Sequence, residues 1–144
     1  MPENCLICER VQTAKEGKNP YLIHEFKNSF LVIGDHQYFK GYSVLLLKDH
    51  VRELHELPPS RQQELFSELM AVGRAVFEAF HPWKMNYSCY GNQIPHIHWH
   101  IFPRYESDPD HLHNPWWNSS EFGKHPIQEA ERTESIKRIK AELK

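Results

Sequence analysis

The sequence has little of several things, and each shortage excludes a class of protein. It contains only three cysteines, and a small odd number argues against a disulfide framework. No apolar run approaches the ~20 residues of a transmembrane helix, so we expect no membrane partner. The formal net charge is −2, and no basic excess indicates nucleic-acid binding. The Gly-x-x-x-x-Gly-Lys loop is also absent, which excludes a P-loop enzyme.

The start of the chain also lacks a feature. It reads Met1-Pro2-Glu3-Asn4, without the basic and apolar segments of a signal peptide. Together with the cysteine content, this favours a cytoplasmic protein. A length of 144 residues suits a single domain, residues 1–144, with its own hydrophobic core.

Hydrophobic patterning predicts an α+β protein with an antiparallel sheet. The expected strands cover residues 21–26, 29–33, 42–47, 86–90 and 96–102. A short helical turn is expected over 51–57, followed by a long helix with Ser60 as its N-cap and Gln63 completing a capping box, ending at residues 81–82. One stripe of this helix carries apolar residues at helical spacing: Leu65, Leu69, Val72, Val76 and Phe80. Residues 106–124 indicate a long loop, and a final helix begins near Pro126.

Three histidines alternate along the last predicted strand. Residues 96–102 read His-Ile-His-Trp-His-Ile-Phe, and every second side chain of a strand shares a face. His96, His98 and His100 therefore share one face, with the apolar residues between them on the other. An imidazole near neutral pH can be a nucleophile, a proton carrier or a metal ligand. The pattern by itself is compatible with a polar sheet face, a plain metal site or a catalytic row.

This segment resembles the signature of the histidine-triad (HIT) superfamily, His-φ-His-φ-His-φ-φ with φ apolar, at every position. The resemblance extends from Cys5 to about Arg104, and leaves a C-terminal loop and helix over 105–144. It implies a HIT-like fold, an antiparallel five-stranded sheet with one long helix and a C-terminal helix. It also implies cleavage of a purine-nucleotide conjugate at the α-phosphate through a covalent histidyl-nucleotide.

The resemblance assigns roles to the three histidines. His98 would be the nucleophile, with an unprotonated Nε2 that attacks phosphorus and a proton on the other ring nitrogen held by an acceptor such as a backbone carbonyl. His100 would donate to a phosphoryl oxygen, and His96 would orient the site. We expect His98 to face solvent, so that its replacement leaves the fold intact.

Substrate contacts are expected from two loops. Asn92 and Gln93 precede the first histidine, where the best-known members carry Gln-Ser or Gln-Thr. Because this chain has no hydroxyl there, the choice between a phosphoramidate and a dinucleoside polyphosphate stays open. Asp35 aligns with a family aspartate that binds ribose hydroxyls, although an aspartate in a turn can equally satisfy its own backbone.

For three other residues, the sequence is compatible with two different roles. Arg104 could face the phosphates or cap the end of its strand. Trp116 and Trp117 could cover the substrate or pack on a partner subunit.

A Cys-x-x-Cys pair, Cys5 and Cys8, opens the chain. It could be a redox pair, half of a zinc site or two small buried residues, although no strand precedes it as in thioredoxin-like proteins. Zinc takes four ligands, and His50 and His96 can converge on the cysteines if their strands end at the same side of the sheet. Resemblance to some bacterial members implies one structural zinc ion bound by these four residues.

Two further functions compete with a HIT nucleotidyl hydrolase or transferase. One is a nucleotide-binding interaction or regulatory protein with little turnover. The other is a zinc hydrolase with metal-activated water at the triad.

The resemblance also implies a homodimer, because family members commonly pair through the long helix and an edge strand. Phe66, Met70 and Phe77 widen the apolar stripe of the long helix beyond the need of one sheet contact. Alternatively, the C-terminal helix covers them through three apolar residues: Ile136, Ile139 and Leu143.

Overall fold

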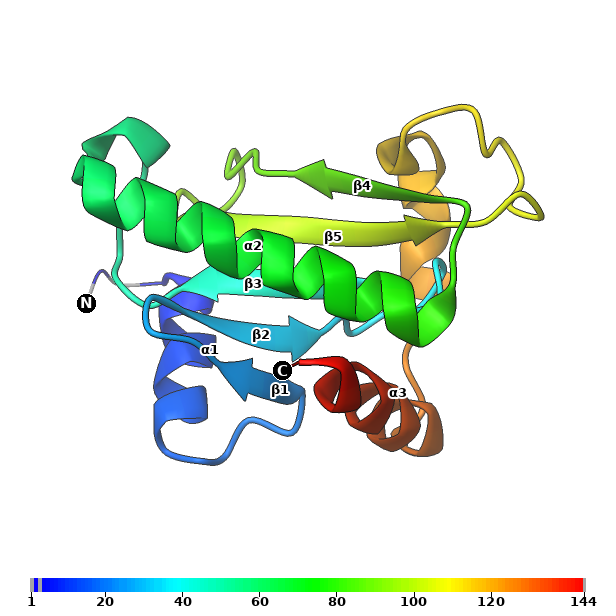
Figure 1. Ribbon diagram of the computed structural model, residues 1–144, viewed down its shortest axis with the longest axis horizontal. Coiled ribbons are helices and arrows are strands. Elements are labelled where there is room, and N and C mark those ends of the chain that lie inside the picture. The colour runs from blue at the N-terminus through cyan, green and yellow to red at the C-terminus, as the bar shows by residue number, and fades with distance from the viewer. Residues whose placement is uncertain (1, 3, 144) are drawn as a thin grey trace.

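Five short strands form one antiparallel sheet in the computed structural model (Figure 1). They are β1 (Leu22–Glu25), β2 (Ser29–Ile33), β3 (Ser43–Leu47), β4 (Lys84–Ser88) and β5 (His98–Arg104), in the order β1-β2-β3-β5-β4. This confirms the predicted α+β fold with its five-stranded sheet. The structure describes residue 2 and residues 4–143, so Met1, Glu3 and Lys144 of the predicted domain 1–144 lie outside the described residues.

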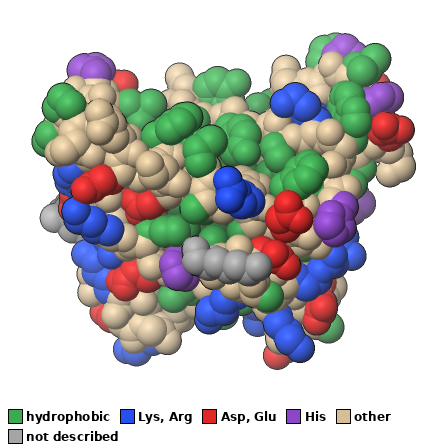
Figure 2. Space-filling view, in the orientation of Figure 1, with side chains coloured by type: hydrophobic (Ala, Val, Ile, Leu, Met, Phe, Trp, Pro, Cys, Tyr) green, Lys and Arg blue, Asp and Glu red, His purple; other side chains and the backbone are tan. Residues whose placement is uncertain are grey.

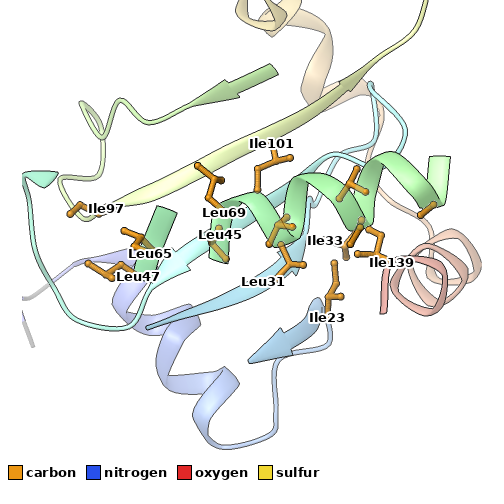
Figure 3. Close-up of a cluster of buried hydrophobic side chains, with 14 of the residues drawn as sticks. Ile23, Leu31, Ile33, Leu45, Leu47, Leu65, Leu69, Ile97, Ile101 and Ile139 are labelled. Atoms are coloured by element: carbon orange, nitrogen blue, oxygen red, sulfur yellow. The ribbon is translucent and has the colours of Figure 1, made fainter. Parts of the chain in front are cut away.

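The main core lies between the sheet and two helices, α2 (Pro59–Phe80) and α3 (Glu129–Glu142). Figure 3 shows side chains of the sheet meeting those of α2, and Ile139 of α3 closes the cluster. All five residues of the predicted stripe on the long helix are buried. Each fully buried side chain of this kind contributes about 1.5–3 kcal/mol.

A second layer covers the opposite face of the sheet (Figure 1). It consists of α1 (Leu6–Lys15) and a kinked 3-10 segment, η2 (Pro115–Lys124). Because both faces are covered, β2 and β3 are buried at every position. The sequence analysis missed α1, and its prediction of a loop throughout 106–124 is wrong because η2 lies there. Asn114 caps η2 by accepting a hydrogen bond from the Trp116 amide at 3.0 Å.

Several predicted boundaries shift. The long helix begins at Pro59, so Ser60 is inside it and is not its N-cap. A proline suits this first position because its missing N–H would have no partner there. The helix ends at Phe80, where His81 adopts a left-handed conformation with φ 49°. The short turn is η1 (Leu54–Glu56).

The triad strand begins two residues later than predicted. The His96 amide donates to the Ile94 carbonyl at 2.8 Å, which places His96 in the turn that leads into β5. Strand β4, at the edge of the sheet beside β5, begins and ends two residues earlier than predicted. Among the described residues, no helix has both the length and the apolar character needed to cross a membrane.

Candidate functional site

His98 and His100 lie on the face of β5 that is opposite to α2. Ile97 and Ile101 point into the α2 core, as the alternation predicts. The two histidine rings meet edge to face, with centroids 4.9 Å apart. His98 is only 7% exposed, so the expectation that it faces solvent is wrong. The turn before β5 and the start of η2 lie next to His98 on this face of the sheet.

The hydrogen bonding of His98 fixes its tautomer. Its Nδ1 lies 2.6 Å from the carbonyl oxygen of His96. A carbonyl oxygen can only accept, so Nδ1 carries the hydrogen and Nε2 keeps its lone pair. This is the arrangement required of an imidazole nucleophile.

His100 is paired with a tyrosine that the sequence analysis missed. The Tyr42 hydroxyl lies 2.7 Å from Nδ1 of His100 and has no other hydrogen-bond partner among the described residues. Burial raises the pKa of Tyr42, so this hydroxyl keeps its proton. If the hydroxyl donates a hydrogen bond to Nδ1, then Nδ1 of a neutral His100 is the acceptor and the ring hydrogen lies on Nε2. Burial, with a contribution from His98, lowers the pKa of His100 to about 4, so the ring is neutral at pH 7.

A cavity of about 540 Å³ opens in front of these histidines. The turn before β5 and the start of η2 form its walls, and its lining includes His98, His100, Asn92 and Gln93. With Trp116, which also lines the cavity, the structure brings together five of the residues that the sequence analysis singled out. The other lining residues are Tyr90, Gly91, Ile94, Asn114 and Trp116.

Asp35 does not line this cavity. Its carboxylate lies 3.5 Å from the Arg10 guanidinium and is 56% exposed. Its backbone carbonyl accepts from the Ile127 amide at 2.9 Å. The neighbouring His36 is stacked between Tyr42 and Phe122. The described structure therefore ties the Asp35 loop to α1 and to the segment after η2.

Arg104 and the two tryptophans of the C-terminal segment differ in position. Arg104 is 1% exposed and donates to the Asn86 side chain at 2.9 Å and to the His113 carbonyl at 2.6 Å. It therefore anchors the loop after β5 and does not line the cavity. Trp116 lines the cavity, whereas Trp117 is 62% exposed.

Four potential metal ligands cluster beside the cavity. Their ligand atoms, from Cys5, Cys8, His50 and His96, all lie within 4.8 Å of one another. His50 follows β3 and His96 precedes the antiparallel strand β5, so both lie at the same end of the sheet. Cys5 and Cys8, at the start of α1, meet them there. Burial, with a contribution from Cys5, raises the pKa of Cys8 to about 11, so a bound cation would be needed to hold it as a thiolate.

Four of the six distances between the ligand atoms of this cluster match a tetrahedral zinc site. Zinc–sulfur bonds of ~2.3 Å and zinc–nitrogen bonds of ~2.0 Å place tetrahedral ligands about 3.3–3.8 Å apart. The observed distances are 3.2 Å between the two Nδ1 atoms, 3.3 Å from Cys8 to His50, and 3.5 and 3.6 Å from Cys8 and Cys5 to His96. Nε2 of His96 donates to the Leu47 carbonyl at 2.7 Å, which leaves the Nδ1 lone pair directed at the cluster.

Comparison with known proteins supports the resemblance to the HIT superfamily. The model of the family described as the HIT domain matches residues 17–107. "Protein hit" of Bacillus subtilis (strain 168) is 26% identical over 112 residues, 72% of this chain and 72% of that protein. "Adenylylsulfatase HINT3" of Arabidopsis thaliana is 26% identical over 114 residues, 75% of this chain and 56% of that protein.

Solved structures are similar over most of the chain. A histidine triad protein of Sinorhizobium meliloti 1021 is 25% identical, with a TM-score of 0.75 over 85% of this chain and 88% of that one. A zinc-bound histidine triad family protein of Mycobacterium smegmatis, 21% identical, has the same fold, with a TM-score of 0.69 over 97% and 93% of the two chains. The family match covers more than half of the chain and includes the alternating histidines, so the chain belongs to the HIT family.

Proposed function

We propose that the protein is a nucleotidyl hydrolase or transferase that works through a covalent intermediate on His98. The observation that carries this proposal is the 2.6 Å contact between His98 Nδ1 and the His96 carbonyl. It leaves Nε2 as the only ring nitrogen of His98 with a free lone pair, in a cavity large enough for a phosphate group with its substituents.

The proposed reaction has two displacements at the same phosphorus. Nε2 of His98 attacks the α-phosphorus, a P–N bond forms, and the P–O or P–N bond to the leaving group breaks. The leaving group departs with the electron pair of that bond and takes up a proton from solvent. Water, or another acceptor in a transferase, then attacks phosphorus and gives up its proton to solvent, and the bond to His98 breaks with its electron pair returning to Nε2. His100 supports both steps if its Nε2–H donates to a phosphoryl oxygen, because the charge on these oxygens increases in each transition state.

The remaining substrate contacts follow from the cavity. Asn92 and Gln93 offer amide groups to the phosphate or to the leaving group. We keep Asp35 as a proposed ribose ligand on the strength of the family resemblance alone. Its exposed carboxylate would have to exchange its contact with Arg10 for two ribose hydroxyls.

We also propose that Cys5, Cys8, His50 and His96 bind one structural zinc ion. Four protein ligands complete a tetrahedral zinc site and leave no position for a reactive water. This argues against the zinc-hydrolase alternative and makes stabilisation of the fold the expected role of the ion. Because both thiols must be reduced to bind zinc, a cytoplasmic location is part of the proposal.

A homodimer is the proposed assembly. Phe66, Met70 and Phe77 of α2 are 59%, 40% and 41% exposed, so α3 does not cover them. Figure 2 shows hydrophobic side chains gathered over α2 on this face of the molecule. A second copy of the chain would remove this apolar surface from water.

One observation favours the competing function, a nucleotide-binding protein with little turnover. The Trp116 ring stands perpendicular to His100 at 4.9 Å between centroids, which narrows the approach to the triad. A screen of adenosine and guanosine conjugates separates the two functions. Steady release of nucleoside monophosphate from phosphoramidates or dinucleoside polyphosphates, abolished in His98→Ala, supports the enzyme. Tight binding with no release in any conjugate would contradict it.

A further inference from the structure

The reaction cavity has an aromatic wall that lies outside the part of the chain matched by the HIT family model. This model ends at residue 107, and the wall is Trp116 at the start of η2. Trp116 and Tyr90 both line the cavity and lie edge to face beside each other, with ring centroids 6.2 Å apart at 69°. Two aromatic rings thus stand next to the histidines that would receive the phosphate.

Trp116 is held firmly in this position. Its indole Nε1 donates to the Ser88 hydroxyl of β4 at 3.1 Å. Its ring also packs against Phe102 and Phe122, at 5.5 and 5.7 Å between centroids. An indole fixed by a hydrogen bond and by packing on other rings loses little entropy when a ligand stacks on it.

The loop that leads to Trp116 is anchored separately. The buried Arg104 donates to the His113 carbonyl at 2.6 Å, and its Nε lies 3.4 Å from the Asp108 carboxylate. Its guanidinium lies 4.7 Å from the centre of the Phe39 ring. Removing a partner from such a buried ion pair is costly, so this loop has a strongly specified conformation.

The cavity continues beyond this wall. A second cavity of about 530 Å³ runs along β4, the edge strand, and shares Tyr90, Asn114 and Trp116 with the first. It is also aromatic, since Trp83 and His111 line it with their rings 5.3 Å apart. A ring placed on Trp116 therefore has room to carry further substituents.

We propose that Trp116 and Tyr90 determine substrate specificity by binding a flat aromatic ring attached to the phosphate that His98 receives, with this ring stacked on one of the two side chains and against the edge of the other. The ring belongs either to the nucleobase or to an aromatic leaving group, and both present the same π surface. The inference rests on the proposed function, because that function places the α-phosphate at His98. It adds a substrate preference supplied by this chain's own C-terminal segment.

Binding to His98→Ala, which retains both aromatic residues, tests the proposal without turnover. One arm compares adenosine 5′-phosphoramidates with a benzylamine or a butylamine group. The other compares adenosine 5′-phosphate with ribose 5-phosphate. Calorimetry should show tighter binding of the ring-bearing ligand by about tenfold in the arm that contains the stacked ring.

Further substitutions in the same background locate the ring. Tyr90 is 67% exposed, so Tyr90→Ala preserves the fold and should weaken the preference, and Trp116→Leu should abolish it. Tyr90→Phe and Trp117→Leu should keep it, since the first retains the ring and the second changes an indole outside the cavity. If the variants lose the preference for benzylamine over butylamine, the two side chains form a leaving-group site. If they lose the preference for adenosine 5′-phosphate over ribose 5-phosphate, the two side chains form a base site.

An unchanged preference in both Tyr90→Ala and Trp116→Leu, or no preference in either arm, would overturn the proposal. Failure of the proposed function gives a different result. In that case the ring preference is present in the binding data, but wild-type protein forms no covalent adduct on His98.

Discussion

His96 contacts both the proposed metal site and the proposed nucleophile. Its side-chain Nδ1 lies among the ligands of the cluster, and its carbonyl oxygen accepts from Nδ1 of His98 at 2.6 Å. One residue therefore links the geometry of the cluster to the tautomer of the reactive imidazole. Loss of metal should consequently disturb catalysis through the backbone, and to a smaller extent than loss of His98 itself.

Zinc content and stability should fall together when the cluster loses a ligand. We expect Cys5→Ser and Cys8→Ser to lower the zinc content, measured by elemental analysis, and the melting temperature, because metal binding contributes to folding. Activity of the folded fraction should fall less than in His98→Ala. Cys89→Ser is the matched control, since Cys89 lies outside the cluster. Protein purified without chelator that holds no zinc would contradict this prediction.

Tyr42 should act as a positioning residue for His100. Tyr42→Phe removes the hydroxyl 2.7 Å from Nδ1 and frees the ring to change tautomer or orientation. We expect kcat to fall about 10- to 100-fold, as for other residues that orient a functional histidine. The free energy of unfolding should fall by about 1–3 kcal/mol, because a buried polar group loses its partner. Tyr38→Phe removes a hydroxyl outside the cavity and should change neither quantity. Equal kcat in the two variants would count against this role.

The depressed pKa of His100 has a consequence for stability. Above pH 6.5 the ring is neutral in both the folded and unfolded states. Between about pH 6.5 and 4 only the unfolded state takes up the proton, so the free energy of unfolding decreases as the pH falls, by up to about 3 kcal/mol. Denaturant titrations at pH 7 and pH 4.5 should show a larger decrease in wild type than in His100→Gln. The difference between the two proteins isolates this residue, and identical decreases would refute the prediction.

The exposed apolar stripe of α2 should control assembly. Light scattering at micromolar concentration should give a mass near two chains for wild type and near one for Phe66→Glu, because a charge in the interface loses its hydration. Leu112 is also an exposed apolar residue, but it lies in the loop after β5, so Leu112→Glu should stay dimeric. Wild type that is already monomeric would end the dimer proposal.

The sequence predicts most of the site because alternation and spacing are local. The faces of β5 follow from period-two alternation, and the stripe of α2 follows from its 3.6-residue period. The metal cluster was predicted from a Cys-x-x-Cys pair and two histidines near strand ends. These features depend little on the rest of the chain, apart from the pairing of β3 with β5.

Other features depend on contacts that no local pattern specifies. Tyr42 precedes β3 like many core aromatic residues, and only the three-dimensional fold brings its hydroxyl to His100. The surroundings of His98 include the start of η2, an element that the sequence analysis missed. Asn114-Pro115 was an available signal for η2, since a capping side chain followed by proline favours the start of a helix.

Intact-mass analysis of reactions quenched and kept at alkaline pH, where a P–N bond to histidine survives, tests the central claim most directly. Wild-type protein mixed with a cleavable nucleotide conjugate should gain the mass of one nucleotidyl group per chain, and peptide mapping should place it on His98. His98→Ala should show no adduct, and its reaction rate should fall by several orders of magnitude. Because the replaced side chain is buried, the melting temperature of this variant is measured as a control for folding. Turnover without any adduct, together with an active His98→Ala protein, would contradict the account.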